Sequence, residues 1–186
     1  MTEKIICAGF GGQGIMAMGK IIALSALNEG KFVTWLPSYG AEVRGGTANC
    51  AVIISDNEIA SPYFDKADTL IMLNEPSLKK FKNSIRSKGL LLVNSSMADC
   101  KATSRRLDVV NVPMTEMATK LGLERVANTI AIGVYLAKKK IISMSTMEKA
   151  IEEVLKGREK LITINKRALE EGFFYTQKHG RGKNES

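Results

Sequence analysis

The sequence is poor in the side chains from which most hydrolytic and metal-dependent active sites are built. Its 186 residues include one histidine, His179, and three cysteines, Cys7, Cys50 and Cys100. A histidine-based triad or a zinc site needs more imidazole and thiolate groups than these. No cysteines form a Cys-x-x-Cys pair, their odd number argues against a disulfide framework, and an iron–sulfur cluster usually takes four thiolates. We therefore expect no catalytic residue and no metal ligands in this chain, and an exposed His179 near its end.

Long hydrophobic runs are also missing. No apolar stretch approaches the roughly 18 residues of a membrane-spanning helix. The chain passes from Met1 directly into a strand-like run at Lys4, without the pattern of a secretory signal. We therefore expect a cytoplasmic protein that is not embedded in a membrane. Hydrophobic residues make up 45% of the sequence, enough for one sizeable domain over residues 1–186.

The net charge of +8 limits the kinds of partner that the chain can have. Basic residues are scattered, with small clusters at 138–140 and 178–183, and no stacking aromatic residues interleave with them. This pattern favours a solvated surface or tail, with an acidic partner or an anionic cofactor as the next interpretation. We do not expect nucleic-acid binding, which calls for a denser basic surface.

Strand-like and helix-like segments alternate along the first two thirds of the chain. Short apolar runs rich in branched residues predict buried strands, at residues 4–8, 32–36, 51–54, 69–73, 89–94 and 109–112. Helical spacing predicts helices from about Gln13 to Gly30, from Glu75 to Ser84, and through a C-terminal part at about 115–180.

The order of these elements predicts an α/β fold, a three-layer α/β/α sandwich with C-terminal helices. The first strand, the first helix and the second strand form a unit that predicts parallel strands and a right-handed crossover. A turn signal at residues 55–57, followed by residues 58–61, predicts a β-hairpin. The sheet is therefore expected to be mixed and mostly parallel.

A glycine-rich loop follows the first predicted strand and contains Gly9, Gly11, Gly12, Gln13 and Gly14. The spacing Gly-x-Gly-x-x-Gly between a strand and a helix matches a dinucleotide-binding fingerprint. That fingerprint also expects an acid at the end of the second strand, and no acid occurs between Glu29 and Glu42. A dinucleotide-dependent enzyme is therefore disfavoured. Two interpretations remain open, an anion site at a helix N-terminus and a tight turn that needs glycine for packing.

A second loop combines charge with backbone freedom. It contains Tyr39, Glu42, Arg44, Gly45 and Gly46. Glu42 and Arg44 stand two apart, so in an extended segment they face the same side. The Arg44 guanidinium is suited to a phosphate or a carboxylate. The alternative is a surface loop with a weak ion pair.

Polar residues also follow two later strands, at Asn74 and at Asn94, Ser95 and Ser96. Ligands of open α/β sheets bind at this edge. Helix caps and turns are the more frequent use of these residue types, and we expect that use here.

With these two loops the chain resembles the gamma subunit of the 2-oxoacid:acceptor (ferredoxin) oxidoreductases. A Gly-x-Gly-Gly-Gln-Gly loop marks that family and is matched by residues 9–14. A Tyr-Gly-x-Glu-x-Arg-Gly-Gly loop is matched by residues 39–46. The resemblance covers residues 4–175 and includes Ser61-Pro62 and an Asn128-x-x-x-x-Gly133 stretch. The second loop is most similar to the 2-oxoglutarate-type branch.

The resemblance implies one part of a larger enzyme. Such complexes decarboxylate a 2-oxoacid oxidatively to acyl-coenzyme A, with thiamine diphosphate, Mg and iron–sulfur clusters on alpha, beta and ferredoxin-like delta subunits. The gamma subunit is implied to help close the coenzyme A region and to be inactive alone. The two loops, Gly9 to Gly14 and Tyr39 to Gly46, are the implied contacts with coenzyme A or with a neighbouring subunit.

Several alternatives stay open at this point. One is a stand-alone α/β module that binds a nucleotide with the 9–14 loop. Another is a purely structural subunit, whose loops serve only assembly. The isolated chain could also form a homodimer.

Overall fold

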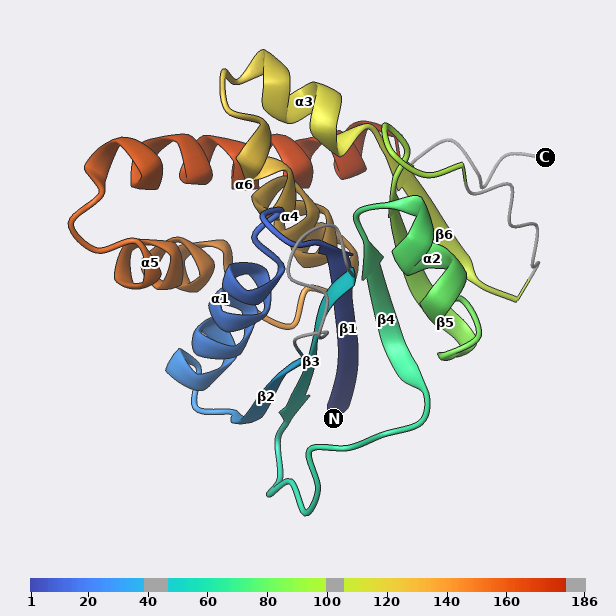
Figure 1. The fold of residues 1–186 in the computed structure, drawn as a ribbon. Helices are drawn as coiled ribbons and strands as arrows, with labels where there is room; N and C mark the ends of the chain where they lie inside the picture. The colour runs from blue at the N-terminus through green and yellow to red at the C-terminus, as the bar shows by residue number, and fades with distance from the viewer. Residues whose placement is uncertain (39–46, 100–105, 180–186) are drawn as a thin grey trace.

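The computed structural model describes residues 1–38, 47–99 and 106–179 of the chain. Within them, six strands form one sheet in the order β2-β3-β1-β4-β5-β6 (Figure 1). The strands are β1 Thr2–Phe10, β2 Phe32–Ser38, β3 Thr47–Ser55, β4 Ala67–Met72, β5 Ile85–Asn94 and β6 Asp108–Val112. The helical elements are α1 Ile15–Asn28, α2 Glu75–Phe81, α3 Met114–Lys120, the 3-10 turn η1 Glu124–Val126, α4 Ala127–Lys139, α5 Met144–Val154 and α6 Glu159–His179.

The sheet is mixed and mostly parallel, as the sequence predicts. β1, β4, β5 and β6 pair in parallel, whereas β3 pairs antiparallel with both β1 and β2. β2 consequently runs in the same direction as β1, as expected for a strand–helix–strand unit. The two strands are not neighbours, however, because β3 lies between them.

The predicted hairpin between β3 and residues 58–61 is wrong. Those residues form no strand, because β3 is already paired on both of its sides. On one side it pairs with β1, and on the other with β2, where Phe32 lies opposite Ser55 and Ser38 lies opposite Asn49. The residues of the predicted turn instead contact the N-terminus of the chain. Asp56 accepts hydrogen bonds from the N-terminal ammonium group at 2.7 Å and from Lys31 Nζ at 2.8 Å. The two strands that are consecutive in sequence and pair antiparallel are thus β2 and β3, not β3 and residues 58–61.

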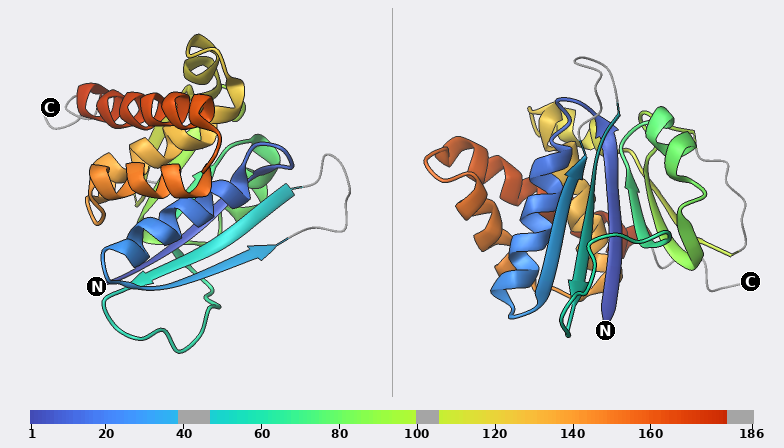
Figure 2. Two further views of the ribbon diagram at one scale, coloured as in Figure 1. Left: turned by 90° about the vertical axis from the view of Figure 1, so that its left-hand side faces the viewer. Right: turned by 60° about the horizontal axis from the view of Figure 1, so that its bottom comes forward.

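Helices cover the two faces of the sheet unequally (Figure 2). Alternate residues of β1 point to opposite faces, and Ile5 and Cys7 belong to a large core with α1, α4 and α5. Ala8 belongs to a smaller core, in which Leu78 of α2 and Phe64 cover the other face. The three-layer sandwich is therefore present, with one thick and one thin helical layer.

The C-terminal helices begin close to the predicted boundary and run from Met114 to His179. α4 is buried along most of its length and lies beside α6. A side chain at Gly133 would collide with the carbonyl oxygen of Leu169, and one at Gly172 with that of Ile130. The two glycines therefore let the helix backbones approach closely. No helix in the described residues is long and apolar enough to cross a membrane.

A buried polar cluster joins β1, β4 and α4 at the end of the sheet where β1 and β4 begin. Glu3 is only 6% exposed, accepts a hydrogen bond from Thr69 Oγ1 at 2.6 Å and pairs with Lys139 Nζ at 3.0 Å. The Tyr135 hydroxyl is buried nearby without a hydrogen-bond partner in the described residues. Burial and the nearby carboxylates of Glu3 and Asp68 raise the pKa of Tyr135.

Replacement of Tyr135 by Phe tests this arrangement. An unpaired buried hydroxyl costs about 1 to 3 kcal/mol, so Tyr135→Phe is expected to keep or raise the free energy of unfolding at neutral pH. The raised pKa keeps the hydroxyl protonated in the fold, while the unfolded chain ionises near the ordinary value of 10.0. The free energy of unfolding of the wild type should therefore fall as the pH rises past that value, and the free energy of unfolding of Tyr135→Phe should fall less.

Urea unfolding at neutral and alkaline pH measures both effects. The control is Tyr63→Phe, because the Tyr63 side chain is 75% exposed. Its replacement should change neither the free energy of unfolding at neutral pH nor the decrease of that free energy at alkaline pH. A loss of more than about 1 kcal/mol in Tyr135→Phe at neutral pH would mean that the hydroxyl is hydrogen-bonded.

Candidate functional site

The glycine loop turns sharply between β1 and α1, and the side chain of Gln13 holds the turn closed. The Gln13 N–H donates to the Phe10 carbonyl at 3.1 Å. In return, the Phe10 N–H donates to Gln13 Oε1 at 2.7 Å. The same Oε1 accepts from Asn74 Nδ2 at 3.2 Å. Gln13 therefore ties the carboxyl end of the central strand to the segment that follows β4.

Packing and backbone geometry account for three of the four glycines. A Cβ at Gly9 would lie 2.6 Å from Gln13 Oε1 and 3.2 Å from the Leu73 Cβ. Gly12 and Gly14 have φ angles of 94° and 74°, in the left-handed region that favours glycine. At Gly14 a side chain would also strike Asn128, whose Nδ2 donates to the Gly14 carbonyl at 3.1 Å.

Gly11 is different, because no contact or backbone angle among the described residues requires a glycine there. It is exposed, it is not among the residues with positive φ, and a Cβ built on it meets no atom within 4 Å. A glycine in open space is suited to a position where another molecule approaches the backbone closely. α1 begins just beyond it and has no side-chain cap, which leaves amide donors for an anion at its first turn.

A shallow hollow lies against this loop. It has a volume of about 320 Å³ and is lined by Gly11, Gly12, Gln13, Thr115, Glu124, Arg125 and Ala127. Arg125 is exposed and has no hydrogen-bond or ion-pair partner among residues 1–38, 47–99 and 106–179. The sequence predictions missed Arg125 because it belongs to a short 3-10 turn before an apolar helix. Only the fold brings it beside residues more than 100 positions earlier.

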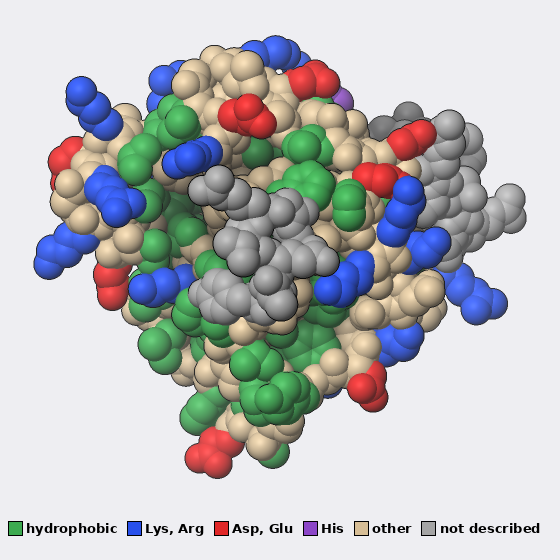
Figure 3. Space-filling model, viewed as in Figure 1, with side chains coloured by type: hydrophobic (Ala, Val, Ile, Leu, Met, Phe, Trp, Pro, Cys, Tyr) green, Lys and Arg blue, Asp and Glu red, His purple; other side chains and the backbone are tan. Residues whose placement is uncertain are grey.

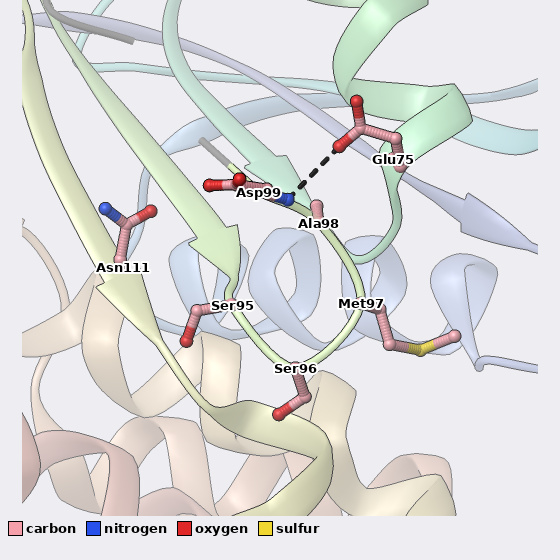
Figure 4. A pocket seen from close by; sticks show the side chains of 7 residues that line it. All are labelled: Glu75, Ser95, Ser96, Met97, Ala98, Asp99 and Asn111. Carbon is pink, nitrogen blue, oxygen red and sulfur yellow. Dashed lines mark hydrogen bonds between the residues drawn. The ribbon is translucent and has the colours of Figure 1, made fainter. Parts of the chain in front are cut away.

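A larger hollow at the same sheet edge is less suited to an anion (Figure 4). Its volume is about 530 Å³, and its lining consists of Glu75, Ser95, Ser96, Met97, Ala98, Asp99 and Asn111. The Asp99 N–H donates to Glu75 Oε2 at 3.2 Å, so two carboxyl side chains border the space. No cationic side chain of the described residues lines this hollow to offset their negative charge, which would repel a phosphate, whereas Arg125 offsets Glu124 in the smaller hollow.

Asn74, which follows β4, and Asn94, the last residue of β5, have the structural use that the sequence predicts, whereas Ser95 and Ser96 line the larger hollow. Asn74 caps α2 by accepting the Ser77 N–H at 2.9 Å. Asn94 is fully buried and its Nδ2 donates to the Leu73 carbonyl at 3.2 Å and to Thr115 Oγ1 at 2.8 Å. These contacts hold the segment after β4, the end of β5 and Thr115 together beside the glycine loop.

The second loop cannot be placed by the structure. Tyr39, Glu42, Arg44, Gly45 and Gly46 lie outside the described residues. The residues on either side of that loop are described, and Thr47 pairs with Phe10, the residue directly before Gly11. The described residues that flank it, Ser38 at the end of β2 and Thr47 at the start of β3, lie at the sheet edge that carries the glycine loop.

Two of the three cysteines and the histidine lie in the described residues. Cys7 and Cys50 are cross-strand partners in β1 and β3, both fully buried and both free thiols. A hydrogen bond with Cys50, together with burial, raises the pKa of Cys7. His179 is exposed and stacks on Tyr175, with ring centroids 4.1 Å apart. In the described residues no three Cys, His, Asp or Glu side chains gather as a metal site.

A comparison with known protein families decides the affiliation. The family described as pyruvate ferredoxin/flavodoxin oxidoreductase matches residues 4–175, nearly the whole chain. The chain belongs to this family.

The oxidoreductase family includes relatives in which the matching part is one third of a longer protein. The chain is 37% identical over 180 residues to the ketoisovalerate oxidoreductase subunit VorA of Methanothermobacter thermautotrophicus. The match covers 96% of this chain and 37% of VorA, so the chain spans less than half of the length of this relative.

Solved structures of oxidoreductases confirm the fold. The keto/oxoacid ferredoxin oxidoreductase gamma subunit of Geobacter sulfurreducens is 28% identical, with a TM-score of 0.84 over 96% of this chain and 98% of that one. This match confirms the resemblance to gamma subunits. The 2-oxoglutarate:ferredoxin oxidoreductase of Magnetococcus marinus, solved with 2-oxoglutarate, coenzyme A and succinyl-CoA, has the same fold. Its TM-score is 0.86 at 22% identity, over 95% of this chain and 31% of that one.

Alanine substitutions in the loop separate structural from functional glycines. Gly14→Ala forces a left-handed residue and a clash with Asn128, so it should lower the free energy of unfolding by about 2 kcal/mol or more. Gly11→Ala adds the same methyl group in open space and should change it by less than about 0.5 kcal/mol. Urea unfolding of both variants measures the difference. Equal losses would show that Gly11 is also held by the fold.

Proposed function

We propose that this chain is the gamma subunit of a multi-subunit 2-oxoacid:acceptor oxidoreductase, which decarboxylates a 2-oxoacid oxidatively to acyl-coenzyme A. The observation that carries the proposal is the match with a solved gamma subunit, which extends over nearly all of both chains. The expected partners are alpha and beta subunits and a ferredoxin-like delta subunit, in the cytoplasm. The role of this chain is to assist assembly and to close the coenzyme A region.

Thiamine diphosphate, Mg and the iron–sulfur clusters are assigned to those other subunits. The cysteines of this chain do not fit a cluster, since two of the three are buried between β1 and β3 against α1. Thiamine diphosphate would supply the decarboxylation chemistry in the assembled enzyme. The residues described here bind and position, and none is proposed to transfer a proton.

Coenzyme A is the ligand that we propose for the glycine-loop hollow. Its phosphates need several donors and positive charge, which the amides of Gly11 and Gly12, the first turn of α1 and the guanidinium of Arg125 can supply. Tyr39, Glu42 and Arg44, with the adjacent glycines, are proposed to complete this region. The coenzyme A bound in the Magnetococcus enzyme of the same fold supports the choice of ligand.

The substrate is proposed to be 2-oxoglutarate, from the wording of the second loop. A branched 2-oxoacid is the second candidate, because VorA is named for ketoisovalerate and is 37% identical. Other subunits are expected to make most of this choice.

Co-purification of the tagged chain from its own host tests the proposed function. The eluate should contain partner polypeptides with bound thiamine diphosphate and iron–sulfur clusters. It should oxidise a 2-oxoacid only when coenzyme A is present, and comparison of 2-oxoglutarate with ketoisovalerate names the substrate. A chain that elutes alone and inactive would contradict the proposal. Micromolar nucleotide binding by that lone chain would then favour a stand-alone nucleotide-binding module.

Arg125→Ala tests the coenzyme A contact within the assembled enzyme. Loss of one charge-assisted hydrogen bond costs about 1.5 to 3 kcal/mol, so the KM for coenzyme A should rise at least about tenfold, with a smaller change in kcat. The matched control is Arg167→Ala, which removes an exposed arginine from α6. An unchanged KM in Arg125→Ala would remove Arg125 from the site. The same assay of Arg44→Ala decides whether the second loop contributes.

A further inference from the structure

The outer face of β2 and β3 has no helix packed on it in the described part of the chain. α1 packs on the inner face of these strands, where Val33 and Trp35 join the large core. On the outer face, α2 packs on β1 and β4, and it reaches the start of β3 through Lys80 Nζ, which donates to Thr47 Oγ1 at 3.5 Å. Figure 2 shows the two strands at the margin of the sheet, with helices on one side of them.

This uncovered face is apolar. Because side chains alternate along a strand, Phe32, Thr34 and Leu36 of β2 point away from the large core. Leu36 lies beside Ala51 of β3, which lies beside Ile6 of β1. Phe32 is 45% exposed, and the other three apolar side chains are half-buried. Ile53, which points to the same face of β3, is only 2% exposed, and Ile6 also packs against the smaller core, so the face is open mainly along β2. We call Phe32, Leu36, Ala51 and Ile6 the outer β2–β3 surface.

The margin of this surface is an unpaired strand edge. β2 ends the sheet, so one side of its backbone has no ladder partner within the described residues. Its seven residues, FVTWLPS, include no charge that would discourage docking. Natural proteins usually protect such edges by charge, by proline, by a bulge or by a covering segment, and Pro37 is the one such device within β2. An apolar edge strand next to an apolar face indicates a surface that is covered in the working protein.

Positive charge lies near the surface. Lys4 shares the β1 end of this face, and its Nζ lies 5.8 Å from the centre of the Phe64 ring. Lys80 of α2 reaches Thr47 Oγ1 at 3.5 Å and has no carboxylate partner in the described residues. In Figure 3, hydrophobic side chains gather below the grey residues, with Lys and Arg side chains on both sides. A partner with an apolar centre and acidic margins would complement this face and the net charge of +8.

The relatives indicate which partner this is. In VorA the part that matches this chain is joined covalently to nearly two thirds of additional sequence, and in the Magnetococcus enzyme to an even larger share. Since this domain occurs both fused and as a separate chain, the missing part is expected to lie against it as a separate polypeptide. We propose that the outer β2–β3 surface docks the polypeptide equivalent to the part of VorA that this chain lacks, an inference that rests on the proposed function.

Two charge substitutions in the native complex test the docking surface. In Phe32→Glu and Leu36→Glu the tagged chain should recover at least about tenfold less of the large partner, because a carboxylate must be buried unpaired. The matched control is Phe174→Glu on α6, where Phe174 is 59% exposed and should tolerate the change. The amount of partner per chain is measured by quantitative mass spectrometry of the eluate.

The outcomes separate this inference from the proposed function. Full recovery of the partner by both variants would overturn the docking surface and leave the proposed function intact. A wild-type chain without a large partner would overturn both. Loss of a dimer of this chain with unchanged partner recovery would assign the surface to a second copy and overturn the inference.

Hydrogen exchange in the wild-type complex provides a second test that does not depend on variant folding. The backbone of β2 is at the sheet margin, so its amides on the unpaired side should exchange slowly only when the partner covers them. Fast exchange at 32–38 in the intact complex would contradict docking, even if a variant failed to fold.

Discussion

The side chain of Gln13 is the contact on which the arrangement of the candidate site depends. Its Oε1 receives hydrogen bonds from the Phe10 amide and from Asn74, so one carboxamide links the ends of two parallel strands. With Gln13 turned inward, Gly11 and Gly12 are left on the exposed side of the loop. The same turn starts α1 at Gly14, where Asn128 of α4 holds the carbonyl. The loop is consequently a rigid junction of three elements.

This rigidity suits a subunit that positions a ligand without reacting with it. Preorganised backbone donors lose little freedom on binding, and an unpaired arginine nearby adds charge without a strong competing contact. The close crossing of α4 and α6 at Gly133 and Gly172 serves the same end, because it fixes the start of α4 beside the hollow. The outer face of β2 and β3 is the opposite case, since no helix in the described residues packs on it. One domain therefore combines a tightly held loop at the candidate site with a helix-free sheet margin, to which we assign the docking of a partner.

Patterns within short segments predicted most of the fold. The apolar runs that became β4 and the second half of β5 are buried on both faces, and such runs are recognisable without knowledge of their neighbours. Pairing was harder to predict, because residues 58–61 have the local pattern of a return strand. What decided against them was competition, since β1 and β2 occupy both edges of β3. The site shows the same limit, because Arg125 has no local signal.

The sequence alone determined the strand and helix segments, the glycine-loop turn and the scarcity of metal-binding side chains, because each depends on residue type and on neighbours a few positions away. Only the tertiary structure decided which glycines are structural. Gly9 and Gly14 are crowded by Leu73 and Asn128, whereas Gly11 is open. It also decided that β3 separates β1 from β2 and that, in the described residues, no helix packs on the outer face of β2 and β3. The physical reason is that packing depends on contacts between residues far apart in sequence, which local patterns do not encode.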